Sequence, residues 1–417
     1  MKNAFRIFRP DSRYRSLLAS ITIMALGYGI YKGIFDNYLA QVVGMGEFDR
    51  GVSEFFRELP GLCLIFILAV FYRFTAEKLF RIGLFVMFLG MAMQAVIPPG
   101  KALVILAIFI YSVGEHIQLG MKSTLSLEYS REGAGGRSLG IIGSFQQAGN
   151  LIGFIAVIVI FNLFVNKSLN VPAGVSDGVL DSAKGNTLFY PLFAVAAAFM
   201  GIAAFISLRL TSTQKSDESK RRFYFRKKFR TYYILEVFYG ARKQVFFTFG
   251  PYVLILFYGA DASVISLLFA VSAVSCFVLS PVVGRIIDRV GYKPVMVCDT
   301  LILVVVCFFY GFAHHLFCMH TAMIVCCVNY VLDSVISLAS MASNVYVQDI
   351  SENRNEMRST ISTGLSVNHL VTVLVALFGG WIWQILGIEA LFVLSAVLGL
   401  CNSAYAATIK VKKISCI

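Results

Sequence analysis

Twelve long apolar runs, joined by short polar connections, dominate this sequence of 417 residues. An α-helix needs about 20 apolar residues to cross a bilayer core of about 30 Å. Every backbone amide must be hydrogen-bonded inside lipid, so runs of this length are helices and not barrel strands. The sequence therefore predicts an all-α polytopic membrane protein with twelve transmembrane helices. The runs are residues 17–43, 52–72, 79–97, 102–127, 138–164, 188–209, 233–258, 262–284, 294–313, 318–347, 359–385 and 389–409.

The composition excludes several other classes of protein. Only 14% of the residues are charged and 58% are hydrophobic, whereas a soluble domain carries roughly 25% charged residues. A cytosolic enzyme, a disordered chain and a secreted disulfide scaffold are therefore excluded. The nine cysteines lack metal-ligand spacing. The pair His314-His315 ends an apolar run, which we interpret as an interfacial position, with a metal site as the minor alternative. No phosphate-binding GxxxxGK[ST] motif occurs. We expect no cofactor, no metal and no enzymatic activity.

The basic residues predict the orientation of the chain in the membrane. If the N-terminus is cytoplasmic, 27 Lys and Arg residues fall in inner segments and only four in outer loops. Positive residues concentrate on the cytoplasmic side of membrane proteins, so both termini are predicted to be cytoplasmic in the cell membrane. This asymmetry explains the net charge of +13 without a nucleic-acid partner. The lipid bilayer is the expected large partner, and a monomer suffices.

An internal repeat divides the chain into two halves. The segment Tyr28–Lys32 (YGIYK) matches Tyr239–Lys243 (YGARK) across 211 positions, and Arg-Ser opens the runs at 138 and 359 alike. We predict an N-terminal six-helix bundle over 1–210, a basic cytoplasmic loop over 211–232 and a C-terminal six-helix bundle over 233–417. Two such parallel halves are typical of transporters whose site lies between them.

The loop between the eighth and ninth runs carries a recognisable motif. Gly284, Asp288, Arg289, Gly291 and Lys293 match the pattern G-x-x-x-D-R-x-G-R-[KR]-x, with Tyr292 at one basic position. The chain therefore resembles the major facilitator superfamily of secondary transporters. This resemblance implies two pseudo-symmetric six-helix bundles that alternate access to a central site. It also implies that Gly284 allows two helices to approach closely. The resulting gating candidates are Gly284, Asp288, Arg289, Glu128, Arg137, Asp349 and Arg358.

Ionisable residues inside the runs mark the candidate site, because a charge at membrane depth needs a partner or an aqueous cavity. In the resembled family, the first, fourth, seventh and tenth helices line the cavity, and these runs hold most of the internal charge here. Lys32 and Lys243 are expected to face each other and bind an anion, as paired basic residues do in the related organophosphate transporters. The substrate-binding candidates are Lys32, Lys243, Tyr28, Tyr239, Gln118, Lys122, Gln147, Asn329 and Asn368. The proton-coupling candidates are Asp36, Glu115 and Asp333.

The predicted function is secondary transport of a small organic anion or zwitterion, either proton-coupled or by exchange. A competing interpretation pairs Lys32 with Asp36 and Lys122 with Glu115, which leaves no net positive site. Glu54, Arg57 and Glu58 are interpreted as an interfacial structural cluster, and His116 and His369 as packing residues. The alternative function is proton-coupled efflux of amphipathic drugs or lipids, which the many aromatic residues favour.

Overall fold

The computed structural model describes residues 7–9, 13–64, 71, 74–131, 134–166, 182–210, 225–352 and 354–409. Most of these residues are helical, and their one β pairing is an isolated bridge between Phe8 and Ser130. Most of the predicted basic loop, residues 211–224, lies outside the described residues. The all-α prediction is confirmed.

The chain divides into two compact units, each described here by itself. The first unit comprises Met1–Met45, Phe56–Ser219 and Gly259–Ala270, and the second comprises Gly46–Phe55, Lys220–Tyr258 and Val271–Ile417. The short segments Gly46–Phe55 and Gly259–Ala270 therefore group with the unit opposite to the rest of their sequence half. The division into halves at 210 and 233 stays a prediction.

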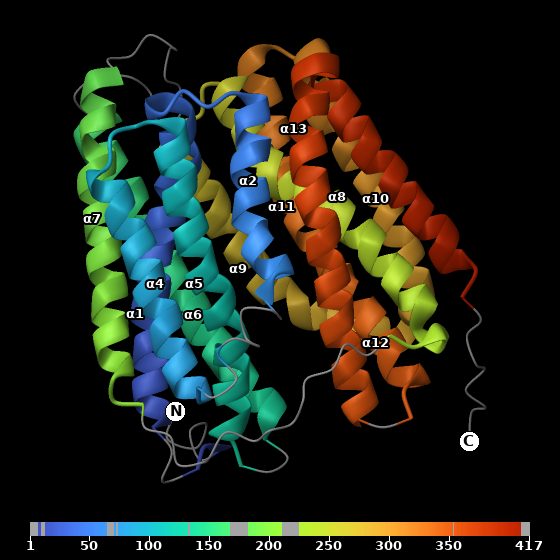
Figure 1. The fold of residues 1–417 in the computed structure, drawn as a ribbon. Helices are drawn as coiled ribbons and strands as arrows, with labels where there is room; N and C mark the ends of the chain where they lie inside the picture. Colours follow the sequence, from blue (N-terminus) through green and yellow to red (C-terminus); the bar gives the residue numbers. More distant parts are fainter. Residues whose placement is uncertain are drawn as a thin grey trace. The chain divides into compact units, whose positions relative to one another are not determined.

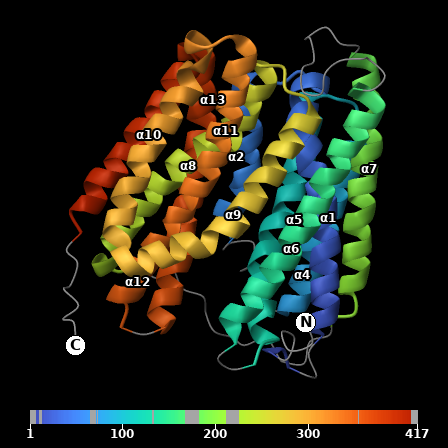
Figure 2. The ribbon, with the colours of Figure 1, turned by 180° about the vertical axis from the view of Figure 1, so that it is seen from behind.

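In the first unit, α1 packs against α6 and α7, while α4 packs against α5 and α7 (Figures 1 and 2). A short π-helix, η2, continues α1. The elements are α1 (Tyr14–Asn37), η2 (Tyr38–Val42), α4 (Ala76–Val96), α5 (Lys101–Glu128), α6 (Gly135–Phe161), η3 (Asn162–Asn166) and α7 (Ser182–Ser207).

In the second unit, α13 packs against both α8 and α10, and α10 packs against α11 (Figure 2). An aromatic core that includes Tyr232, Tyr292 and Tyr346 fills one end of this unit. The elements are η4 (Lys227–Phe229), α8 (Arg230–Leu256), α10 (Tyr292–Leu316), α11 (Met319–Ile336), η5 (Ser337–Ser340), α12 (Met341–Ile350) and α13 (Arg354–Ala407). Two further helices, α2 (Glu47–Leu62) and α9 (Ala262–Val290), contribute residues to both units.

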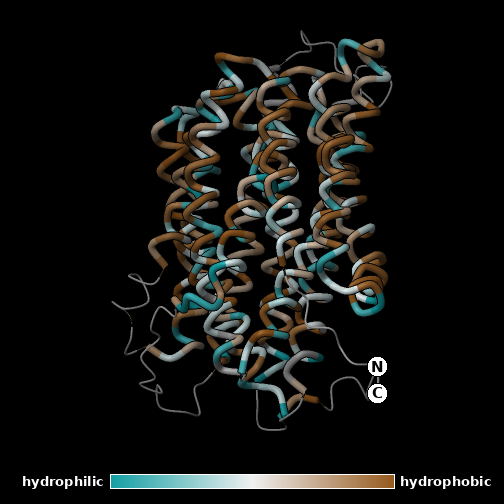
Figure 3. Tube along the Cα trace, turned by 90° about the vertical axis from the view of Figure 1, so that its right-hand side faces the viewer, coloured by the Kyte–Doolittle hydropathy of each residue, from teal (hydrophilic) through white to brown (hydrophobic). Residues whose placement is uncertain are grey.

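Nine helical segments within the described residues are long and apolar enough to cross a membrane. The apolar character of these helices is visible in the brown tube of Figure 3. Helices α2 and α8 are absent from the nine, since α2 has only 16 described residues and α8 carries charged residues that lower its hydropathy. The longest segment, α13, joins the last two predicted runs across a kink at Gly387, where φ is +88°. The chain is an integral membrane protein with the predicted helical architecture.

Helices α1 and α6 cross at two glycines, Gly29 and Gly153. A Cβ atom added at Gly29 would lie 2.3 Å from the Asn150 carbonyl oxygen, and one at Gly153 would lie 2.5 Å from the Leu26 carbonyl oxygen. Both neighbours are backbone atoms of a packed helix, so neither can turn aside. Small residues permit such close contact between membrane helices.

We expect Gly29→Ala to destabilise the first unit by about 1–3 kcal/mol, because the added methyl group overpacks the α1–α6 contact. Thermal unfolding of the detergent-purified protein measures this change. Gly120→Ala is the matched control, since a Cβ at Gly120 in α5 would meet no atom within 4 Å. Equal unfolding temperatures for both variants would contradict the prediction.

Candidate functional site

Lys32 and Asp36 form an ion pair on one face of α1. The Lys32 Nζ lies 2.8 Å from the Asp36 Oδ2, and the Asp36 side chain is fully buried. The ammonium group also lies 5.1 Å from the centre of the Phe269 ring in the same unit, which is the range of a cation–π contact. Lys32 is thus neutralised locally, as the competing interpretation of the sequence expected. Tyr28, one turn earlier, is half-buried.

Arg57 of α2 joins two carboxylates in the first unit. Its guanidinium contacts Glu58, and its Nη1 lies 3.3 Å from the Glu115 Oε2 on α5. The Tyr111 hydroxyl donates to the other Glu115 oxygen at 3.2 Å. Glu115 therefore has Arg57 as its ion-pair partner, and the mostly buried contacts of Arg57 and Glu58 fit the structural role expected of them.

The remaining polar candidates of the first unit bond to neighbouring side chains. The Lys122 Nζ donates to the Gln146 Oε1 at 2.6 Å, so the expected pairing with Glu115 is replaced by an amide. Gln147 accepts a hydrogen bond from Asn150 at 3.0 Å. Gln118 is buried and packs beside Gly83 of α4.

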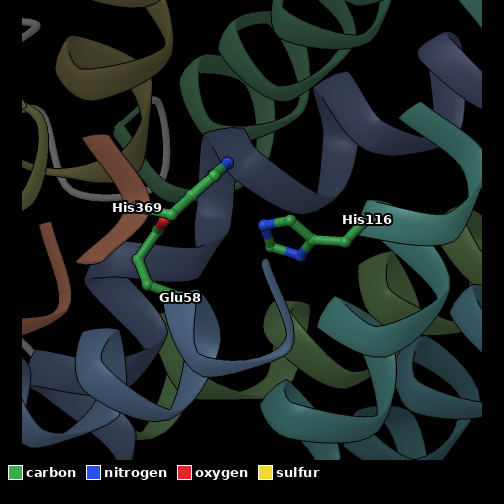
Figure 4. A group of neighbouring side chains, drawn as sticks. All are labelled: Glu58, His116 and His369. Atoms are coloured by element: carbon green, nitrogen blue, oxygen red, sulfur yellow. The ribbon is translucent and has the colours of Figure 1, made fainter. Parts of the chain in front are cut away.

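His116 and Glu58 lie near Arg57 in the same unit. Figure 4 draws His116 on α5 and Glu58 on α2, together with His369 of α13, which belongs to the second unit. The His116 Nδ1 lies 2.9 Å from the Ser112 carbonyl oxygen, one turn earlier. This contact within one helix orients the imidazole ring.

The second unit contains a buried ion pair that the sequence did not reveal. The Arg242 Nη2 lies 3.0 Å from the Asp299 Oδ2 on α10, and the two side chains are 2% and 4% exposed. Tyr239 donates to the same Asp299 oxygen at 3.4 Å, and its ring lies 4.8 Å from the Arg242 guanidinium carbon. Tyr239, a predicted substrate ligand, is therefore placed beside this ion pair.

Lys243, the next residue, has a different environment. Its side chain is exposed, and it has no hydrogen bond or ion pair with any residue that the structure describes. The carboxylates of Asp333 and Glu236 act on it through space within the second unit. Lys243 is thus a cation in the middle of α8 that no described side chain neutralises by direct contact.

The other candidates of the second unit surround Glu236. The Ser343 hydroxyl donates to the Glu236 Oε1 at 2.9 Å, and the Asn368 Nδ2 donates to its Oε2 at 3.4 Å. Asn329 is buried and donates to the Val325 carbonyl oxygen at 2.8 Å. Asp333 is also buried, on the same helix.

A second buried ion pair of this unit lies in the first turns of α2. The Arg50 Nη1 lies 2.8 Å from the Glu54 Oε2, and Gln244 of α8 donates to the other Glu54 oxygen at 3.1 Å. The Arg50 and Glu54 side chains are 1% and 0% exposed. The buried contacts of Glu54 fit the structural role expected of it, and its interfacial position stays a prediction.

The motif that identified the gating candidates adopts a sharp turn. Gly291 has a φ of +90°, a left-handed conformation that favours glycine, and it separates α9 from α10. A Cβ at Gly284 would meet no atom of the described residues within 4 Å, and its role in close helix approach stays a prediction. Asp288 and Arg289 are exposed and form no ion pair within the described residues.

The other gating candidates lie at the ends of helices. Glu128, Arg137 and Asp349 are exposed, and the side chain of Arg358 lies outside the described residues. The ion pairs at this end of the second unit involve different residues: Arg226 and Lys228 both contact Glu356, at 3.3 and 3.0 Å. Hydrogen bonds to Glu352 and Glu356 raise the pKa of Lys228.

Breaking one buried ion pair gives a direct test of these contacts. We expect Asp299→Asn to destabilise the protein by about 3–5 kcal/mol, because the Arg242 charge would remain buried without its counter-ion. Thermal unfolding in detergent measures the loss. Asp288→Asn, at an exposed position on α9, is the control. If the unfolding temperature of Asp299→Asn equals that of the wild type, the assignment of a buried Arg242–Asp299 ion pair is contradicted.

Comparison with known proteins finds one family model that matches part of the chain. Residues 232–413 match the family model described as Major Facilitator Superfamily, whereas no curated protein matches the sequence. A mutant of the nucleoside transporter NupG is similar in structure, with a TM-score of 0.73, 14% identity and coverage of 95% of this chain and 99% of that one.

Two other solved transporters have the same fold. The D-xylose-proton symporter gives a TM-score of 0.69 at 13% identity, and the match covers 94% of this chain and 96% of the symporter chain. A POT family transporter in complex with 5-aminolevulinic acid gives 0.71 at 11% identity, with 93% and 94% covered. The chain therefore matches the Major Facilitator Superfamily model over residues 232–413, and it has the fold of these transporters over nearly its whole length.

Proposed function

We propose that this protein is a secondary transporter that moves a small organic anion or zwitterion by alternating access. The family and the fold support transport as the general activity. One observation supports an anionic group on the substrate: the exposed ammonium of Lys243 in the middle of α8 has no hydrogen bond or ion pair with a described residue. Holding a charge at membrane depth is costly, and a bound carboxylate or phosphate would supply the missing counter-charge.

The neighbours of Lys243 suit a substrate that carries both charges. Asp333 and Glu236 lie near enough to act on Lys243 electrostatically. A zwitterion could place its anionic group on Lys243 and its cationic group near Asp333. The POT family transporter solved with 5-aminolevulinic acid, itself a zwitterion, binds such a ligand within the same fold. Tyr28, Gln118, Lys122, Gln147, Asn329 and Asn368 remain proposed contributors to substrate binding.

The Lys32–Asp36 ion pair is the proposed coupling device of the first unit. Protonation of Asp36 would remove its charge and release Lys32, which would then attract the anionic substrate. The fully buried Asp36 carboxylate and its 2.8 Å contact with Lys32 support this exchange of partners. Glu115 is the second coupling candidate, and its release would also have to break the contact with Arg57.

Ligand binding tests the role of Lys243. Thermal stabilisation of the purified wild type is measured with sugar phosphates, dicarboxylates, amino acids and lipophilic quaternary ammonium ions. We expect an anion or zwitterion to stabilise the wild type and Lys243→Ala to bind it about 10- to 100-fold more weakly, since a charge-assisted hydrogen bond contributes about 1.5–3 kcal/mol. Arg230→Ala, at the exposed start of the same helix, is the control.

Two outcomes would contradict the anion proposal. Unchanged affinity in Lys243→Ala would exclude this lysine as the anion-binding group. Selective stabilisation by lipophilic cations, retained in Lys243→Ala, would favour the alternative of drug or lipid efflux.

Coupling is tested separately with Asp36→Asn in proteoliposomes. Removal of the Asp36 charge mimics the protonated state, so Lys32 is released permanently. We expect substrate exchange between equal concentrations to continue, while uptake driven by a proton gradient is lost. If Asp36→Asn keeps both exchange and gradient-driven uptake, Asp36 is excluded as the coupling residue. Glu352→Gln, at an exposed position just before α13 with no assigned role in transport, controls for the loss of a carboxylate.

A further inference from the structure

A cluster of two imidazoles and one carboxylate lies at the end of α10, far along the helix from the Gly291 turn. The Nε2 atoms of His314 and His315 lie 3.1 and 2.9 Å from the same oxygen, Oε1 of Glu389. The ligand atoms of the three residues all lie within 4.8 Å of one another. All three belong to the second unit, and none takes part in the proposed transport mechanism.

The backbone of α13 positions the Glu389 carboxylate. Gly387, two residues earlier, has a φ of +88°, which redirects the helix axis at this point. A Cβ atom at Gly387 would lie 2.7 Å from the Glu389 Oε2. A side chain there would displace the carboxylate, so the glycine provides both the kink and the space that the carboxylate occupies.

The electrostatic setting favours a cation. The cluster lies in the last turn of α10, where the carbonyl groups at the end of a helix carry partial negative charge. Two neutral imidazoles and one carboxylate add a net charge of about −1. The side chains of His315 and Glu389 are 58% and 30% exposed, so an ion from solution can reach them.

We propose that His314, His315 and Glu389 form a binding site for a divalent transition-metal ion, with Zn²⁺ as the representative ion. Two imidazole nitrogens and one carboxylate oxygen are a ligand set typical of zinc, and water commonly completes it. Imidazole also selects zinc, copper and nickel over magnesium and calcium, which prefer oxygen ligands. The bound ion replaces the hydrogen bonds of the cluster and ties the end of α10 to the segment of α13 beyond the kink.

Zinc binding to the purified full-length protein tests this site. Isothermal titration with zinc chloride is expected to give one saturable site per chain in the wild type. We expect His314→Gln, His315→Gln and Glu389→Gln each to weaken binding at least ~10-fold, since even loss of a residue that only supports a metal ligand costs about 10- to 100-fold. Gly387→Ala should weaken it also, through displacement of the carboxylate.

Nearby residues supply the control. Cys318 and His320 are exposed just beyond the end of α10 but do not belong to the cluster. The double variant Cys318→Ser/His320→Gln should bind zinc as the wild type does. Unfolding temperatures measured without zinc identify any variant that fails to fold. Zinc should raise the unfolding temperature of the wild type and of this control, but not of Glu389→Gln.

The outcomes decide between a built site and adventitious binding. No saturable binding by the wild type, or equal affinity in every variant, would overturn the proposal. Replacement of Zn²⁺ by Co²⁺ adds a spectroscopic readout, because visible absorption bands that vanish in His314→Gln identify the imidazole as a ligand. Lys243→Ala should bind zinc normally, so failure of the metal site and failure of the anion site are distinguishable.

Discussion

Charge compensation inside apolar helices is the constraint on which the rest of this structure depends. Buried ions lose their hydration, and only a close counter-ion with good geometry offsets that loss. Lys32 with Asp36, Arg50 with Glu54, and Arg242 with Asp299 each meet this requirement at 2.8–3.0 Å. The first two pairs brace single helices, whereas the third joins α8 to α10. Lys243 differs from these three cations, because no described residue forms an ion pair with it and the carboxylates of Asp333 and Glu236 act on it only through space.

The helical architecture could be predicted from the sequence because lipid imposes one rule on every span: apolar side chains outside and backbone bonds satisfied within. Hydropathy located even α2 and α8, although their charges lower their apolar content. The residues at which each helix begins and ends were predicted less accurately from hydropathy. The break expected between the runs 359–385 and 389–409 falls at Gly387, whose non-helical conformation separates the two helical parts of α13.

The site could be predicted only where partners share a helix. Lys32 and Asp36 are four residues apart, so helical spacing alone brings them together. Glu115 bonds to Arg57 across 58 residues, and Arg242 finds Asp299 on another helix; no local pattern contains such pairings. A motif glycine such as Gly284 indicates that space is needed for a close approach, but the motif does not identify the neighbouring segment.

The 3₁₀ turn η5, between α11 and α12, changes the rotational phase of the helix that it interrupts. Each 3₁₀ residue turns the chain by about 120° where an α-helical residue turns it by about 100°, so four residues add roughly 80°, close to one residue step. Asn329, Asp333 and Ile336 are buried before the turn, and Ser343 and Val347 after it, while Asn344 is exposed. This extra rotation presents the Ser343 hydroxyl, instead of the Asn344 amide, to Glu236. One tightened turn thus determines which functional group reaches the carboxylate.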